Sequence, residues 1–383
     1  MLTPLTPQQK NTIESIIDQM SPREKAAQVL AWHFGWCTDE TPAEVAEMLD
    51  TYPLGSVFIA YGTVEQSRKV LEVVTEKQRG FKAPVVITAD LVSGVGSRIH
   101  GALNMPAQMA LGATDSEELA EKMGIATAIE GRALGFHWTF SPVVDLNINF
   151  NNPMMHTRSF GENPRHVARM SRAYIRGIQK DNLLAASAKH FPGDGVDDRD
   201  SHVCTSINSL SEQEWMDTYG YVWKEVIDEG VMAVMPGHIA LPWIDPGTNY
   251  LGPPPATYSE KIQIELLRDR LGFQGAVVSD ALPMIGYSGF VPTNDRAAGN
   301  IRTGSDLVLY AKPERDVPQI LKALDEGRLA EERLDDAVRK NLELKMRIGL
   351  FDKNFTPPEL NTEQRETFQV WSDRIGEGSI SVV

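Results

Sequence analysis

Residues 275–282 read Gly275-Ala276-Val277-Val278-Ser279-Asp280-Ala281-Leu282. The stretch is a short apolar run that ends in a single carboxylate. Apolar residues that follow one another without polar alternation are typical of a strand buried on both faces of a parallel sheet. We therefore predict a buried strand over Ala276–Ser279, with Asp280 at its carboxyl end.

Seven similar runs occur elsewhere, and helical patterns alternate with them. The other runs are Val29–Phe34, Gly55–Ala60, Pro84–Ala89, His137–Val144, Leu184–Ala188, Val231–Met235 and Asp306–Tyr310. The amphipathic stretches include Val64–Gln78, Ser116–Leu134, Pro164–Lys180, Glu212–Glu229 and Ser259–Leu271. Eight strands that alternate with helices predict an α/β fold, a (β/α)8 barrel of the TIM type, with an open doubly wound sheet as the competing arrangement.

The end of the chain reads differently from the repeating units. We assign residues 1–352 to the barrel and residues 353–383 to a C-terminal extension that contains Pro357-Pro358. The closing Gly-Glu-Gly-Ser-Ile-Ser-Val-Val reads like the beginning of a strand. Such an extension is what the start of a linker to a second domain would look like.

Charge and composition disfavour several classes of partner. The chain has 383 residues and a formal net charge of −15, which argues against nucleic acid and anionic membranes. Its beginning is polar and acidic, and no run approaches the roughly 18 apolar residues of a membrane span. The two cysteines, Cys37 and Cys204, are far apart, so a disulfide framework or a zinc ribbon is not expected. We predict a cytoplasmic protein.

Polar residues stand at the ends of five predicted strands. They are Asp90, Asp145, Lys189-His190, His238 and Asp280. The carboxyl ends of barrel strands meet at one end of the barrel, where the active sites of such folds lie. These side chains therefore predict a site for a polar ligand, although some of them are expected only to hold loops in place.

The loop after the fifth strand is rich in glycine and carboxylates. It runs from Ala188-Lys189-His190-Phe191-Pro192-Gly193-Asp194-Gly195 to Asp200-Ser201-His202. Asp200 and His202 are two residues apart, so their side chains can share a hydrogen bond. A carboxylate on one imidazole nitrogen fixes the tautomer and raises the basicity of the other nitrogen. We predict an acid/base pair on this loop.

Two other interpretations of this loop stay open. It carries six potential metal ligands, although their spacing matches no recognised metal motif. They are His190, Asp194, Asp197, Asp198, Asp200 and His202. The loop could also be a solvated acidic surface, the less favoured interpretation of its charges.

Three further segments complete the candidate site. Asp280 can act as a nucleophile toward an anomeric carbon if a proton donor stands on the leaving-group side. Arg158, in a loop between small residues, can donate in a planar fork, although a structural salt bridge is the favoured explanation when this residue is taken alone. Asp90, with Arg98 eight residues later, can accept hydrogen bonds from sugar hydroxyls. The glycines between these two residues form no nucleotide-binding motif.

Several motifs together resemble glycoside hydrolase family 3, in particular its bacterial β-N-acetylglucosaminidases of the peptidoglycan-recycling type. The motifs occur in the family's order from about Met20 to about Phe351. They are FSPVVDLN (140–147), NPMMHTRSFGENP (152–164), KHFPGDG (189–195) with the following DSH (200–202), and GFQGAVVSDAL (272–282).

The resemblance implies a role for each candidate residue. Asp280 maps to the family's nucleophile, and Asp200 with His202 maps to the acid/base pair of the N-acetylglucosaminidase branch. Asp145 maps to an aspartate near the same place, with no role assigned. The sugar-binding residues map to Asp90, Arg98, Arg158, Lys189 and His190. No cofactor and no metal ion are implied.

Three departures from this branch affect the sugar specificity. Val92-Ser93-Gly94 stands where the branch has Glu-Gly-Gly, and Gly193-Asp194-Gly195 replaces its Gly-His-Gly. His156 replaces a small residue. The resemblance therefore implies a retaining, exo-acting β-glycosidase acting on a carbohydrate, with β-N-acetylglucosaminidase activity as the first expectation.

Other functions stay open at this point. A β-glucosidase or β-xylosidase is one, and it includes a glucosidase whose acid/base residue comes from another domain. A β-glycoside phosphorylase is another, because a neutral imidazole does not repel a phosphate acceptor as a carboxylate would. A sugar-binding barrel without turnover belongs to a different class, and it would be expected to lack Asp280 or His202.

Overall fold

The structure is a computed structural model that describes residues 2–248, 251–352 and 354–380. In these residues, eight strands form one curled parallel sheet in chain order. They are β1 (Leu30–His33), β2 (Ser56–Phe58), β4 (Val86–Ala89), β6 (Trp138–Thr139), β7 (Ala185–Phe191), β9 (Ala233–Pro236), β11 (Ala276–Val277) and β12 (Val308–Ala311). The two ends of the sheet, at β11 and β12, meet through a parallel bridge between Val278 and Leu307 and through backbone hydrogen bonds such as that from the Ser279 N–H to the Leu307 carbonyl at 2.9 Å.

The eight predicted strands are all present, with some changes in length. The run His137–Val144 is a strand at Trp138–Thr139, and a further parallel bridge joins Val143 to Lys189 just after Pro142, which itself has no N–H to donate. The fifth strand is longer than predicted and continues to Phe191. Its last residues, Lys189, His190 and Phe191, are buried, so this strand carries polar side chains deep into the fold.

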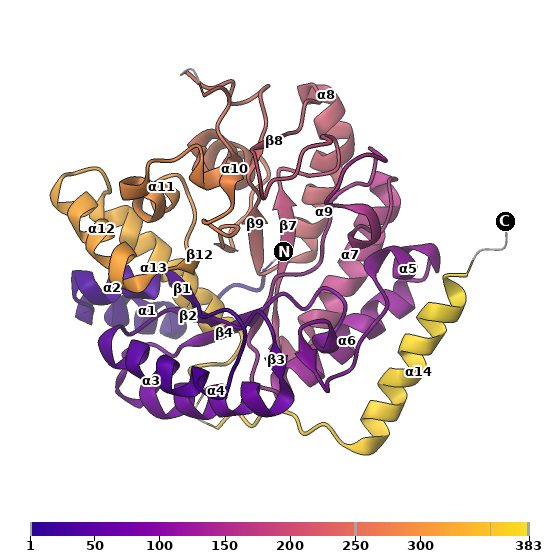
Figure 1. The fold of residues 1–383 in the computed structure, drawn as a ribbon, viewed down its shortest axis with the longest axis horizontal. Coiled ribbons are helices and arrows are strands. Elements are labelled where there is room, and N and C mark those ends of the chain that lie inside the picture. The colour runs from indigo at the N-terminus through magenta and orange to yellow at the C-terminus, as the bar shows by residue number, and fades with distance from the viewer. Residues whose placement is uncertain (1, 249–250, 353, 381–383) are drawn as a thin grey trace.

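Helices surround the sheet on its outer side (Figure 1). The predicted amphipathic stretches correspond to helical segments. The stretch Glu212–Glu229 is divided into α8 and α9 by the π-helical turn η5 (Met216–Gly220). The stretch Ser259–Leu271 forms the π-helix η7 (Lys261–Arg270). The α-helices are α1 (Pro7–Gln19), α2 (Pro22–Gln28), α3 (Thr41–Thr51), α4 (Val64–Lys77), α5 (Gln108–Ala113), α6 (Glu117–Ala133), α7 (Pro164–Ile178), α8 (Glu212–Trp215), α9 (Tyr221–Glu229), α10 (Ile285–Ser288), α11 (Arg296–Arg302), α12 (Pro313–Asp325), α13 (Glu331–Arg347) and α14 (Thr362–Gly378).

Apolar residues are buried on both faces of the sheet. In β1, Leu30 and Trp32 belong to one buried cluster and Ala31, between them, to another. Successive side chains of a strand point to opposite faces, so uninterrupted apolar runs are what this arrangement requires. Two short parallel pairs, β3 (Gly62–Thr63) with β5 (Ile99–His100) and β8 (Ser206–Ile207) with β10 (Ile239–Ala240), lie in loops outside the main sheet.

The C-terminal helix α14 packs against α5 and α6 (Figure 1). Phe368 and Ile375 are buried in this contact, and the Ser372 hydroxyl donates to the Asn104 carbonyl at 3.3 Å. The expectation of a new strand in the closing residues is wrong for Gly376–Gly378, which complete the helix, and residues 381–383 lie outside the described part. Among the described helices, none has the length and apolar character needed to cross a membrane.

Lys345 on α13 is buried, and no acidic side chain among the described residues pairs with it. It is 1% exposed, and its ammonium donates to Gln28 Oε1 at 2.8 Å. Burial lowers the pKa of Lys345 to about 7. Because the unfolded chain holds this proton up to pH about 10.5, the lysine lowers the stability of the fold by roughly 5 kcal/mol below pH 7, and the penalty disappears as the pH rises toward 10.

We expect Lys345→Met to raise the free energy of unfolding at pH 6 by about 2 kcal/mol. This value is the charge penalty less the cost of leaving Gln28 without its partner. The gain should shrink between pH 7 and pH 10, as measured by urea denaturation. Lys322→Met, at a site whose side chain is 70% exposed, serves as the control and should change little. A loss of stability at pH 6 would show that Lys345 is favourably charged in the fold.

Candidate active site

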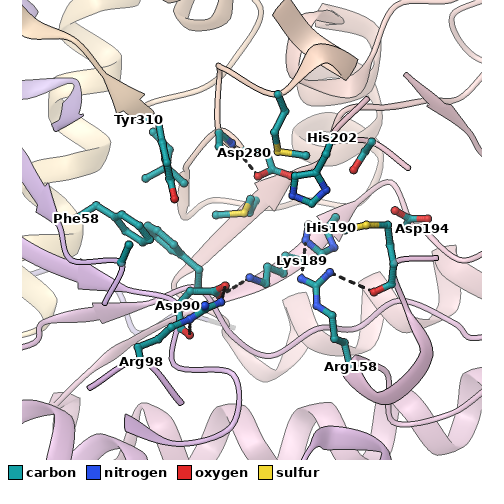
Figure 2. A pocket seen from close by; sticks show the side chains of 18 of the residues that line it. Phe58, Asp90, Arg98, Arg158, Lys189, His190, Asp194, His202, Asp280 and Tyr310 are labelled. Atoms are coloured by element: carbon teal, nitrogen blue, oxygen red, sulfur yellow. Dashed lines mark hydrogen bonds and ion pairs between the residues drawn. The ribbon is translucent and has the colours of Figure 1, made fainter. Parts of the chain in front are cut away.

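A cavity of about 320 Å³ lies at the carboxyl ends of the strands. Seven of the eight predicted site residues line it, and Asp200 stands behind His202. In Figure 2, Asp280 and His202 point into the cavity from one side, and Asp90 and Arg98 lie across from them. The lining residues are Phe58, Ala60, Tyr61, Asp90, Arg98, Phe140, Met154, Arg158, Lys189, His190, Asp194, Ser201, His202, Met235, Asp280, Ala281, Met284, Leu309 and Tyr310.

Asp280 follows β11 and is held by the backbone. Its N–H donates to the Pro236 carbonyl at 3.2 Å, and its Oδ1 accepts the Ala281 N–H at 2.7 Å. Burial pushes the pKa of Asp280 upward, but the nearby imidazoles of His238 and His190, together with the Ala281 N–H, outweigh burial and lower it. The carboxylate is therefore ionised at neutral pH, the state that a nucleophile needs.

The structure brings Asp200 and His202 into direct contact. Asp200 Oδ1 lies 2.8 Å from His202 Nδ1 and accepts the His202 backbone N–H at 2.8 Å. The pKa of Asp200 is lowered, because these two hydrogen bonds outweigh the effect of burial. An ionised Asp200 makes Nδ1 the donor and leaves His202 Nε2 free. The His202 side chain is 56% exposed, so Nε2 can meet a ligand that enters the cavity.

The loop that carries His202 is attached to the segment that follows Asp280. The Ile285 N–H donates to the His202 carbonyl at 2.9 Å, and the Gly286 N–H donates to the Ser201 carbonyl at 3.2 Å. Gly286 must be glycine here, because a Cβ would lie 2.5 Å from the Ser201 oxygen and 2.8 Å from the Cys204 oxygen. The acid/base pair and the candidate nucleophile are thus placed by one packed unit.

Asp90 lies between two cations on the far side of the cavity. Its Oδ1 accepts from the Lys189 ammonium, and its Oδ2 accepts from Arg98 Nη2 at 2.8 Å. Burial raises the pKa of Asp90, but the attraction of Lys189, Arg98 and Arg158 is larger and holds it well below the usual range. Arg98 also donates to the Tyr61 hydroxyl. The cluster presents fixed charges that can bind hydroxyl groups.

His190 is oriented by Asp145. Asp145 is fully buried, and its Oδ2 lies 2.7 Å from His190 Nδ1 and accepts the His190 backbone N–H at 3.1 Å. This leaves His190 Nε2 toward the cavity, 3.5 Å from Arg158 Nη2. Arg158 belongs to the short helix η3 (His156–Arg158) and donates to the Met154 carbonyl at 3.2 Å. It forms no ion pair with any described residue, so the salt-bridge interpretation does not explain it.

The family model for the glycosyl hydrolase family 3 N-terminal domain matches residues 21–344. The chain belongs to glycoside hydrolase family 3. It is 40% identical over 282 residues to a β-N-acetylglucosaminidase/β-glucosidase of Cellulomonas fimi, an alignment that covers 72% of this chain and 50% of that protein. It is 32% identical over 280 residues to a β-hexosaminidase of Neisseria meningitidis serogroup B, covering 70% and 74% of the two chains.

Two solved structures of this family are similar to the present one. A β-glucoside phosphorylase BglX bound to 2FGlc has a TM-score of 0.91 and 30% identity, over 99% of this chain and 68% of that chain. A family 3 β-N-acetylglucosaminidase from Paenibacillus sp. str. FPU-7 has a TM-score of 0.82 and 29% identity, over 95% and 70%. The chain spans about half the length of some curated relatives, 50% for the Cellulomonas protein and 56% for β-hexosaminidase A of Pseudoalteromonas piscicida.

The metal and solvated-loop interpretations find little support in this family 3 chain. Asp197 pairs with Arg199 at 2.7 Å and accepts the Ile207 N–H at 2.6 Å, while Asp194 accepts from Asn152 at 2.9 Å. Burial and the neighbouring Asp145 raise the pKa of Asp194 to about 6. The carboxylates therefore mostly hold the loop together. Within the described ranges, no group of three or more His, Cys, Asp or Glu is placed to bind a metal.

The sequence reasoning missed the aromatic wall of the cavity. Phe58 and Phe140 stack with ring centroids 5.6 Å apart, and Tyr310 lies 5.3 Å from Phe58 and stacks on His33 at 3.9 Å. Phe58, Phe140 and Tyr310 stand at or just beyond the ends of β2, β6 and β12, where the sequence predicted only polar site residues. Conversely, Asp145 and His238 do not line the cavity. His238 donates to the Ala281 carbonyl at 3.0 Å and supports the Asp280 segment.

Proposed function

We propose that this chain is a retaining, exo-acting β-glycosidase, with β-N-acetylglucosaminides as its first substrates. The observation that carries the proposal is the pairing of an ionised Asp280 with an Asp200-bound His202 at one cavity. The names of the Cellulomonas and Neisseria relatives support the sugar. A non-catalytic sugar-binding barrel would have no need for both groups.

In the proposed mechanism, Asp280 attacks the anomeric carbon while His202 protonates the departing oxygen through Nε2. Asp200 stabilises the imidazolium that gives up this proton and keeps the ring in place. The bond to the leaving group breaks, a covalent glycosyl–Asp280 ester forms, and His202 becomes neutral. His202 Nε2 then takes a proton from water as the water attacks the same carbon, which restores Asp280 and retains the anomeric configuration.

The other residues of the cavity bind the sugar in this proposal. Asp90 accepts hydrogen bonds from hydroxyls, Lys189 and Arg158 donate to hydroxyl oxygens, and His190 Nε2 bonds to a further hydroxyl. Arg98 keeps Asp90 ionised and oriented through their 2.8 Å ion pair. The aromatic wall of Phe58, Phe140 and Tyr310 would contact the apolar face of the ring.

Phosphorolysis is the second candidate, and one feature of the acid/base pair favours it. The group that faces the acceptor is an imidazole rather than a carboxylate, so an anionic acceptor meets no like charge from it. Lys189 and Arg158, both at the cavity, add positive charge. The similarity to a β-glucoside phosphorylase over 99% of this chain points the same way. A β-glucosidase or β-xylosidase remains the alternative in sugar specificity.

We also infer that the curled sheet closes as a (β/α)8 barrel, because the Val278–Leu307 bridge joins its two end strands. We propose residues 1–352 as the catalytic domain and residues 353–383 as the extension, part of which is α14. The cytoplasmic location and the absence of nucleic acid as a partner stay predictions from the sequence.

We expect the chain to release nitrophenol from the β-N-acetylglucosaminide faster than from the β-glucoside or the β-xyloside. The measurement is kcat/KM for each, with and without 10 mM phosphate (a concentration chosen as roughly that of cells). Acceleration by phosphate, with a sugar 1-phosphate as product, would make the chain a phosphorylase. Preference for the glucoside or xyloside would overturn the assignment of the sugar but keep the mechanism.

A further inference from the structure

Three apolar side chains lie beside the proposed proton donor. Val203 follows His202 directly, and Ile285 donates its backbone N–H to the His202 carbonyl at 2.9 Å. Val203 is 61% exposed and Ile285 is 53% exposed. Met284, the residue before Ile285, lines the cavity. The two loops are thus joined at the backbone of His202, and each carries an exposed apolar residue next to this junction.

Several specific contacts fix these two loops to each other. Besides the two backbone bonds, the Thr205 hydroxyl donates to the Gly286 carbonyl at 2.7 Å, and Gly286 fits only because it has no Cβ. Exposed single valines and isoleucines are common and need no explanation. Val203 and Ile285 are a different case, because they stand where two loops are joined beside His202, a residue of the cavity, and both remain in water unless something covers them.

The position of His202 indicates which part of a substrate would cover these apolar side chains. A general acid must lie within hydrogen-bond distance of the oxygen that it protonates. The group attached to that oxygen, the aglycone, therefore lies beside His202. Asp90, Arg98 and Lys189 lie across the cavity from His202 (Figure 2), where the proposed function places the sugar. On the His202 side, the apolar Met284 lines the cavity, and the exposed Ile285 follows it in the chain. These two residues favour an aglycone with apolar surface.

We propose that Met284, Ile285 and Val203 form an aglycone-binding surface, and that the substrates are β-glycosides with an alkyl or aryl aglycone. This inference rests on the proposed function, since it takes His202 as the proton donor. The surface contributes binding energy from a part of the substrate that does not react, and this energy can be used in the transition state.

The test is a series of methyl, butyl, hexyl and octyl β-glycosides of the preferred sugar. These alcohols have similar basicity, so chain length changes contact with the surface and not the need for proton transfer. We expect kcat/KM to rise about tenfold from methyl to hexyl, because each buried methylene is worth up to about 0.8 kcal/mol. In the double variant Val203→Ser/Ile285→Ser, the rise should fall to about twofold or less.

Two controls separate this inference from the proposed function. The β-glycosyl fluoride of the same sugar has no aglycone to bind, so the double variant should hydrolyse it at the wild-type rate. Val370→Ser, at a position of α14 that is 54% exposed, should keep the full dependence on chain length. A flat series in the wild-type chain, or an unchanged slope in the double variant, would overturn the aglycone surface alone. Failure of the wild-type chain to hydrolyse the fluoride would remove the proposed function, and the inference with it.

Discussion

Replacing Asp280 with Ala should reduce kcat/KM for every β-glycoside by at least about 10⁴-fold. The proposed reaction passes through a covalent ester to this carboxylate. The other two carboxylates that line the cavity are held elsewhere: Asp90 by Lys189 and Arg98, and Asp194 by the Asn152 amide and the Gly195 N–H. The loss should be the same for good and poor leaving groups, because the nucleophile acts in both. Steady-state assays with the nitrophenyl and methyl glycosides measure it.

A direct observation of the ester complements the kinetics. A 2-deoxy-2-fluoro glycoside slows the second step, so the wild-type chain should accumulate a glycosylated peptide that contains Asp280, detected by mass spectrometry. Asp198→Asn is the matched control, because Asp198 is an exposed carboxylate of the acidic loop that does not line the cavity. Activity within tenfold of wild type in Asp280→Ala, or labelling at another residue, would disprove the assignment of the nucleophile.

Replacing His202 with Ala should have an effect that depends on the leaving group. Methyl glycosides, whose alcohol needs a proton to depart, should lose about 10³-fold in kcat/KM, and dinitrophenyl glycosides should lose much less. With such activated substrates the second step becomes limiting, because water has lost its general base. Added azide should then restore turnover and give a glycosyl azide with retained configuration. His100→Ala, an exposed histidine of β5 that does not line the cavity, serves as the control.

Asp200→Asn tests the pair rather than the imidazole alone. An amide removes the negative charge beside His202 Nδ1, so the imidazolium that protonates the leaving group loses stabilisation. The alkaline limb of the pH profile of kcat/KM for methyl glycosides should therefore move to lower pH, whereas the acidic limb, which depends on Asp280, should stay in place. An alkaline limb at the same pH as in wild type would mean that Asp200 only holds the loop.

Much of the site could be predicted from the sequence because the information is local. One strand ends in Asp280 and another ends in Lys189-His190. These endings predict polar side chains at the same end of a parallel sheet. Asp200 and His202 are two residues apart, so their 2.8 Å contact needs only a turn. The family motifs then assigned roles that no spacing could have given.

The lengths of strands and the end of the chain were less predictable. The fourth strand ends at Thr139, before Pro142, although the long apolar run suggested a longer strand. Residues Gly376–Gly378 extend a helix because Phe368 and Ile375 of α14 pack against the body of the protein, a contact that outweighs the weak helical tendency of two glycines.

By itself, the sequence determined the order of eight buried strands and which of them end in polar side chains, because burial on both faces leaves an uninterrupted apolar run in each. Only the tertiary structure decided which polar residues face the cavity. Asp90 and Asp280 line it, whereas Asp145 and His238 lie behind it and orient His190 and the Asp280 segment. It also decided the docking of the His202 loop on Gly286, since a contact between residues some 80 positions apart depends on the packing of the whole sheet and leaves no pattern along the chain.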